Sequence, residues 1–84
     1  MGIRVGKVTH YFDRIGVAVV DLSGDLTTGD RICVLGRRTE FEQLVSSMEV
    51  DHQQISAGRP GMEIAIQLME PVHPGDILFK LVGD

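Results

Sequence analysis

The side chains best suited to binding chemistry in this 84-residue chain are a few arginines in predicted turns. Arg37 and Arg38 stand together in the segment GRRT, which predicts a tight hairpin. Arginine presents paired, planar donors that suit phosphate, so both are candidate contacts for RNA. The alternative is a solvated polar turn. Arg59, in AGRPG, has two similar interpretations: a structural loop, or an exposed anchor for RNA or a partner protein.

Other basic residues lie on the predicted first strand and its turn, at Arg4, Lys7, His10 and Arg14. Lys7 and Arg14 would extend a basic face if the fold brings them near the paired arginines. Alternating solvent-facing positions explain them equally well. The candidate contacts for RNA or a partner are therefore Arg37, Arg38, Arg59, Arg14 and Lys7.

Catalytic and metal-binding chemistry has little support. His10, His52 and His73 are widely separated, and none has the spacing of paired metal ligands. Asp51 and His52 are adjacent and could suggest a general base, but no nucleophile lies near them. Cys33 lies within an apolar run, as buried and inert thiols do. We predict no catalytic residue, no metal and no cofactor. The absence of a GxxxxGK[ST] segment also predicts no GTP binding.

The overall composition limits the class of protein. With 8 basic and 12 acidic residues the net charge is −4, which makes the chain a poor general binder of phosphate. No apolar run approaches the roughly 20 residues of a membrane span, and the N-terminus has no signal-peptide core. One cysteine cannot form an internal disulfide, which favours a reducing cytoplasm. The length predicts one domain over residues 1–84.

The elements that would position these residues are all predicted strands. Gly and Pro punctuate the chain, and the segment Met62–Met69 alternates apolar and polar residues with a period of two. Met62, Ile64, Ile66 and Leu68 should therefore point mostly inward. A Gly-Asp pair followed by an apolar run occurs twice, at TTGDRICVL and HPGDILFKL, and predicts a turn entering a strand each time.

The predicted fold is all-β, a small closed antiparallel barrel of six or seven strands, because closure would remove exposed sheet edges. A further short strand near Val50–Gln53 is an option. The main strands are expected at Ile3–His10, Ile15–Leu22, Arg31–Gly36, Thr39–Met48, Met62–Met69 and Ile77–Val82.

Several segments in order resemble the second-domain β-barrel of translational GTPases, the elongation factor Tu-like domain 2. They are VGKVTHYF, GVAVVDLSGDLTTGDRICVLG, VSSM, AGRPGMEIAIQL and VHPGDIL, and they span about Val5 to Leu81. In that family the two Gly-Asp turns begin two strands of one barrel. The neighbours of Met48 do not match the residues that hold aminoacyl-transfer RNA there, so the resemblance does not imply that activity.

The resemblance implies a non-enzymatic, translation-factor-like module. It would bind ribosomal or other structured RNA, or a translation-associated protein, through a loop face. The alternative is a protein-interaction or homo-oligomeric module with no RNA role, which the net charge of −4 favours.

Overall fold

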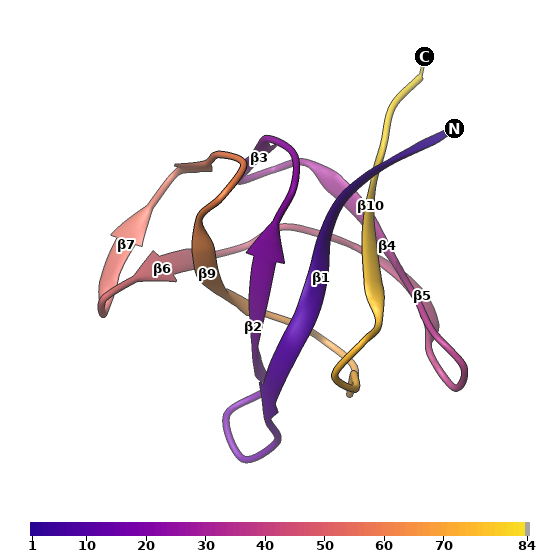
Figure 1. Ribbon diagram of the computed structural model, residues 1–84, viewed down its shortest axis with the longest axis horizontal. Helices are drawn as coiled ribbons and strands as arrows, with labels where there is room; N and C mark the ends of the chain where they lie inside the picture. Colours follow the sequence, from indigo (N-terminus) through magenta and orange to yellow (C-terminus); the bar gives the residue numbers. More distant parts are fainter. Residues whose placement is uncertain (84) are drawn as a thin grey trace.

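The computed structural model describes residues 1–83, and every regular element in this range is a β-strand. Figure 1 shows them curled around one interior, with both termini at the upper end of the view. The ten strands are β1 (Gly2–Phe12), β2 (Val17–Leu22), β3 (Leu26–Thr27), β4 (Arg31–Leu35), β5 (Glu40–Leu44), β6 (Met48–Val50), β7 (Gln53–Ile55), β8 (Ala57–Gly58), β9 (Glu63–Gln67) and β10 (Ile77–Leu81).

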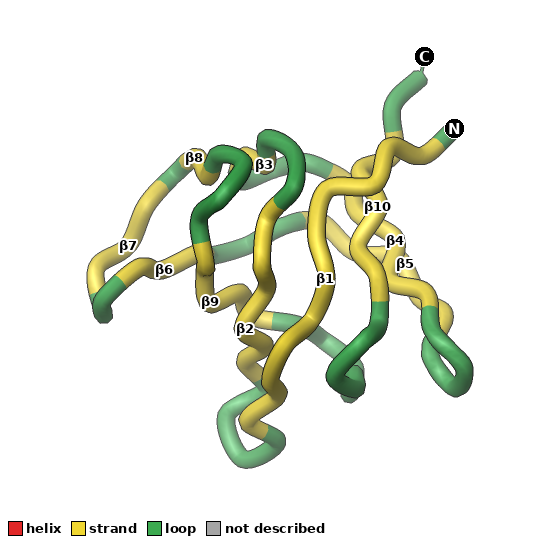
Figure 2. The backbone as a smooth tube through the Cα atoms, in the orientation of Figure 1, coloured by secondary structure: helices red, strands yellow, loops and turns green. Residues whose placement is uncertain are grey.

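Eight strands form one antiparallel sheet in the order β5-β4-β10-β1-β2-β9-β6-β7, and β3 pairs with β8 in a small second sheet. The tube in Figure 2 follows the curvature of the large sheet. Within residues 1–83 the edge strands β5 and β7 do not pair with each other. The all-β prediction is confirmed, but the predicted closed barrel of six or seven strands is wrong.

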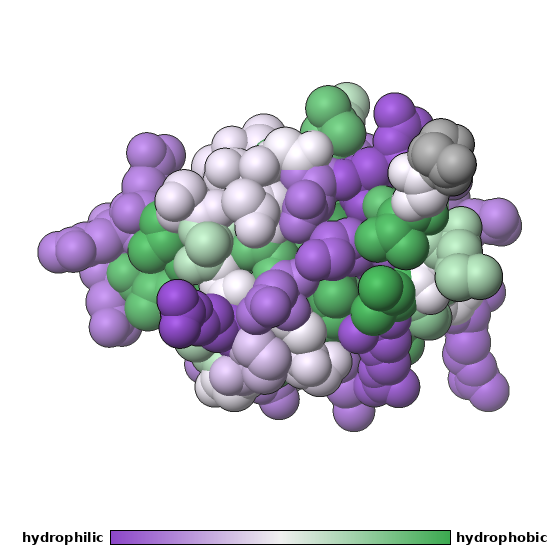
Figure 3. All heavy atoms as spheres, turned by 90° about the horizontal axis from the view of Figure 1, so that it is seen from above, coloured by the Kyte–Doolittle hydropathy of each residue, from purple (hydrophilic) through white to green (hydrophobic). Residues whose placement is uncertain are grey.

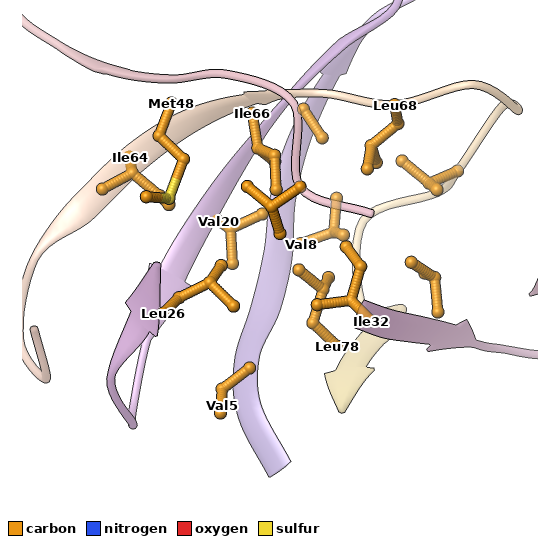
Figure 4. Packing of buried hydrophobic residues seen from close by; sticks show 14 of the residues in the cluster. Val5, Val8, Val20, Leu26, Ile32, Met48, Ile64, Ile66, Leu68 and Leu78 are labelled. Atoms are coloured by element: carbon orange, nitrogen blue, oxygen red, sulfur yellow. The ribbon is translucent and has the colours of Figure 1, made fainter. Parts of the chain in front are cut away.

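One hydrophobic cluster fills the inside of the curl, with side chains from most strands (Figure 4). The alternation in β9 puts Ile64 and Ile66 in this core, and Leu68 follows them beyond the strand. Met62 is partly buried and packs against the same cluster. The prediction that these four side chains point mostly inward is confirmed.

Both Gly-Asp pairs form turns that enter strands, β4 and β10, as predicted. Gly29 and Gly75 have positive φ angles of 91° and 98°, which glycine adopts without strain. The aspartates then make the same pair of contacts. The Asp30 carboxylate accepts from the Thr27 backbone N–H at 2.8 Å, while the Asp30 N–H donates to the Thr27 carbonyl at 3.0 Å. Asp76 repeats this arrangement with His73, at 2.9 and 3.0 Å.

The predicted single strand Thr39–Met48 is wrong, because the chain leaves the sheet after Leu44 and rejoins it at Met48. Phe41, Gln43 and Val45 are buried at a spacing of two, whereas the next buried residue, Met48, follows at a spacing of three. One flat strand cannot present all four to the same side. Near Val50–Gln53 the structure has two short strands in place of the one expected: Val50 ends β6, Gln53 begins β7, and residues 51–52 form the turn between them. Strands β3 and β8 were not predicted.

The gap between β5 and the end of β9 is bridged by a side chain. Gln43 is 7% exposed, and its amide nitrogen donates to the carbonyls of Gln67 and Leu44, both at 3.1 Å. Its amide oxygen accepts from the Met69 backbone N–H at 2.7 Å. Gln43 therefore satisfies partly buried backbone groups that a neighbouring strand would otherwise satisfy.

We expect Gln43→Ala to lower the free energy of unfolding by about 1–3 kcal/mol, because it leaves partly buried backbone groups without partners. The matched control is Gln54→Ala on the exposed side of β7, which should change it by no more than about 0.5 kcal/mol. Urea unfolding followed by circular dichroism measures both. Equal losses in the two variants would contradict the role given to Gln43.

Candidate functional site: an apolar groove between two hairpins

An apolar groove of about 520 Å³ lies on the outer side of the sheet, over β2, β9 and β6. We call it the hairpin groove, because the β1–β2 hairpin and the β6–β7 hairpin form its two sides. Its lining residues are Phe12, Ile15, Val17, Ser47, Glu49, His52, Ala65 and Gln67.

The floor is formed by the outer faces of β2, β9 and β6. Ala65 lies opposite Val19 on β2 and opposite Glu49 on β6, so these three share the outer face of the sheet. Val17 lies opposite Gln67 in the next row of that face. A small residue at the centre, with larger ones around it, leaves the sheet hollow at this point.

The first wall is the β1–β2 hairpin, which exposes two large hydrophobic side chains. Phe12 is 47% exposed and Ile15 is 62% exposed. The His10 ring packs at a tilt against Phe12, with 4.4 Å between ring centroids. From the floor, the Gln67 amide nitrogen donates to the carbonyls of Ile15 and Gly16 at 3.0 and 3.2 Å. One floor residue thereby fixes the position of the wall.

The second wall is the β6–β7 turn. Val50 pairs with Gln53, so Asp51 and His52 form a two-residue turn, and both have positive φ angles, of 52° and 65°. Such turns suit the twist of a hairpin, and Asp and His adopt this conformation more readily than most residues. The turn places His52 at the groove, beside Glu49 and Ser47.

The chemistry available at the groove is binding. Within residues 1–83 no hydrogen bond joins the side chains of Ser47, Glu49 and His52, so they do not form a relay from base to nucleophile. The same part of the chain has no group of three or more His, Cys, Asp or Glu residues placed to hold a metal. An apolar surface with a few polar groups at its rim is typical of a ligand site.

The predicted contact residues lie in several parts of the fold. Arg37 and Arg38 lie in the β4–β5 turn and line a second hollow, of about 390 Å³, with His73 and Asp76. Arg59 lines a different hollow with Asp25 and Thr27, near β8 at the upper end of Figure 2. Arg59 therefore lies at the other end of the molecule from the paired arginines.

The two remaining candidates line neither hollow. Arg14 lies in the β1–β2 turn, at the same lower end of Figure 1 as the β4–β5 turn. Lys7 lies on the outer face of β1, opposite Ile77 on one side and Asp21 on the other. RNA contact by any of these residues stays a prediction.

A buried polar cluster supports the second hollow and was not predicted. Asp76 is 5% exposed and accepts a hydrogen bond from the Thr39 hydroxyl, besides the one from the His73 N–H. The Thr39 oxygen also lies 3.3 Å from His73 Nδ1. A Cβ at Gly36 would overlap the Asp76 carboxylate, so this close approach requires glycine. The cluster joins the β4–β5 turn to the start of β10.

Cys33 is partly exposed on the outer face of β4, not buried as its apolar run suggested. Burial of the thiol, followed by the nearby carboxylates of Glu42 and Glu40, raises its pKa. A raised pKa lowers the thiolate fraction, which makes Cys33 a poor nucleophile. No helix in residues 1–83 is long and apolar enough to cross a membrane.

The chain is similar to part of two proteins that are named as proteases. An uncharacterized protease of Methanocaldococcus jannaschii is 30% identical over 80 residues, which cover 94% of this chain and 20% of the protease. A collagenase of Porphyromonas gingivalis is 36% identical over 80 residues, covering 93% of this chain and 19% of the collagenase. The chain thus spans about a fifth of the length of these curated relatives. No family model matches it.

Solved structures share the fold. The C-terminal domain of a candidate U32 peptidase of Geobacillus thermoleovorans superimposes with a TM-score of 0.87 at 22% identity, over 93% of this chain and 91% of that domain. Its selenomethionine variant gives a TM-score of 0.88.

These findings correct the resemblance drawn from the sequence. The assignment to translational GTPases and the translation-factor-like function inferred from it are wrong, because the similar proteins are proteases and the C-terminal domain of a U32 peptidase. The Gly-Asp turns and the alternating strand on which the resemblance rested describe how a small sheet curls. They carry no information about a partner.

The untested prediction of RNA contact has a direct measurement. If Arg37 and Arg38 each contact a phosphate, the logarithm of the RNA-binding constant should depend less steeply on the logarithm of the salt concentration in Arg37→Ala/Arg38→Ala. The slope should decrease by about 0.7–0.9 for each contact that is lost. Filter binding of structured RNA across a salt series measures the slope. The control is Arg31→Ala, an exposed arginine on β4 outside the candidate set. An unchanged slope in the double variant would contradict the assignment.

Proposed function

We propose that this chain is a non-catalytic module associated with a protease, and that its hairpin groove binds a segment of polypeptide. The observation that carries this proposal is the groove itself, where Phe12 and Ile15 remain largely exposed around a hollow floor. Exposed hydrophobic side chains that surround a concavity are typical of binding sites.

The shape and polarity of the groove favour a polypeptide segment as its ligand. Its volume of about 520 Å³ suits one or two apolar side chains of a bound segment. Ser47, Glu49 and His52 stand along one side and can exchange hydrogen bonds with peptide groups there. The apolar wall would supply affinity, and the polar side would orient the backbone of the ligand.

The association with a protease is supported by the relatives. Two proteins named as a protease and a collagenase match nearly the whole of this chain, although the match covers only about a fifth of each. In the proposed role the module presents polypeptide to a catalytic unit and does no chemistry itself. The raised pKa of Cys33 agrees with this, since it disfavours a thiolate nucleophile. A lone cysteine also favours a reducing compartment.

We expect Phe12→Ser, Ile15→Ser and Ala65→Glu each to weaken peptide binding by about tenfold, because each removes apolar contact or fills the floor with a charge. The probe is a set of fluorescent fragments of denatured collagen, chosen because one relative is named a collagenase. Fluorescence anisotropy gives the affinity, and amide shifts of the labelled protein locate the site.

The matched control is Met69→Ser, which removes another hydrophobic side chain, 82% exposed and outside the groove lining. It should bind like the unaltered protein. A second probe, fragments of casein, distinguishes general polypeptide binding from preference for collagen. Equal affinity in all variants, or no binding of either probe at millimolar protein, would refute the proposal.

A further inference from the structure

A second apolar surface lies on the outer side of β4 and β10, and it is flanked by opposite charges. Strand register aligns Glu42, Cys33, Phe79 and Arg4 in one row across β5, β4, β10 and β1. A parallel row holds Glu40, Leu35, Ile77 and Lys7. Both rows read acidic, apolar, apolar, basic. We call this surface, defined by these eight residues, the β10 face.

The apolar part of the β10 face is open to solvent. Leu35 is 39% exposed, and Cys33, Ile77 and Phe79 are only partly buried. At its upper end Gly2 lies opposite Leu81, so no side chain on β1 covers that leucine. Figure 3 views the molecule from above and shows hydrophobic side chains exposed among hydrophilic ones.

The charges along its two sides are mostly free. Within residues 1–83 no ion pair involves Arg4, Lys7 or Glu40. Glu42 does lie 3.8 Å from Arg31, but both side chains are more than half exposed, and such pairs contribute little. The basic side on β1 and the acidic side on β5 can therefore take partners from another molecule.

We propose that the β10 face binds a second copy of this chain in a two-fold symmetric pair. The two-fold axis would lie between the copies and parallel to β10. The apolar residues on β4 and β10 of one copy would then contact those of the other copy, and the acidic residues on β5 would face the basic residues on β1 of the other copy. Glu40 then faces Lys7 of the second copy, and Glu42 faces Arg4. A surface that is complementary to itself is what a two-fold pair requires.

The curvature of the sheet sets the strength of this contact. The β10 face is on the outside of the curl, so the two copies touch along β4 and β10 and diverge toward β1 and β5. Long side chains occupy the diverging flanks, and Arg4, Lys7, Glu40 and Glu42 can span the gap. The contact is small, and small interfaces of this kind are weak and dissociate on dilution.

Sedimentation equilibrium tests the pair directly. The mass should rise from 9.2 kDa toward twice that value as the protein concentration increases to about 1 mM. Arg4→Glu/Lys7→Glu makes both sides acidic, and Glu40→Lys/Glu42→Lys makes both basic. Each double variant should associate at least tenfold more weakly than the unaltered protein. The quadruple variant, which exchanges the two sides, should regain association.

The matched control is Glu63→Lys/Glu70→Lys, which makes the same change of charge at exposed residues outside the β10 face. It should associate normally. An unaltered protein whose mass stays at 9.2 kDa at all concentrations would overturn the proposal. The β10 face would then be a contact surface for a different polypeptide segment. Association that survives both double variants, or a quadruple variant that fails to recover while it melts normally, would overturn the arrangement.

Cys33 supplies an independent readout, because its thiol lies within the β10 face. Alkylation by iodoacetamide should slow at least threefold as the concentration rises through the range where the mass doubles. The rate should not slow in Arg4→Glu/Lys7→Glu, which stays monomeric. A rate that is the same at all concentrations, in a protein that doubles its mass, would mean that the copies meet elsewhere.

Discussion

The open seam of the sheet is the constraint on which the rest of this structure depends. A strongly curled sheet whose edges do not meet exposes both its core and its unpaired backbone groups. Here one buried glutamine, Gln43, bridges the gap with two hydrogen bonds, to the backbone of Gln67 and of Met69. Buried polar groups are costly unless they are satisfied, so the contact is specific as well as stabilising. It holds the chain after β9 against β5, where Leu68 and Val72 cover the core.

The same contact reaches the outer surface through Gln67. Its backbone carbonyl accepts from Gln43 at the seam, and its side chain donates to the turn that carries Ile15. A single residue thus connects the closure of the core with the wall of the hairpin groove. The position of the groove wall is accordingly tied to the contact that closes the core.

Sequence patterns predicted those elements whose geometry is local. Each Gly-Asp turn needs a residue that adopts a positive φ and a short side chain that accepts a hydrogen bond. The alternation in Met62–Met69 needs only a strand with one buried and one exposed face. The sequence also contains a signal for the break after Val45, because the spacing between successive buried residues changes there from two to three. The signal was hard to recognise because one of these buried residues, Gln43, is polar. The two-residue strands β3 and β8 leave no periodic signal, because they form only through contacts with distant segments.

Surfaces were harder to predict than strands for a related reason. The hairpin groove collects Phe12, Glu49 and Ala65 from three separate parts of the chain. The charge order of the β10 face likewise appears only when the register of four strands is known. The basic residues could be recognised as turn or strand residues. Whether they would share a face depended on the order of the strands, which local patterns do not contain.

The hairpin groove and the β10 face lie on different parts of the sheet, so both can be occupied at the same time. The hairpin groove lies over β2, β9 and β6, whereas the β10 face lies over β4 and β10, on the other side of β1 in the sheet order. A pair of copies joined at the β10 face therefore leaves both grooves open. Two weak sites on one assembly bind a long polypeptide more tightly than either does alone, provided the chain can reach both. A small curled sheet with modest affinity at each surface could in this way retain an extended polypeptide.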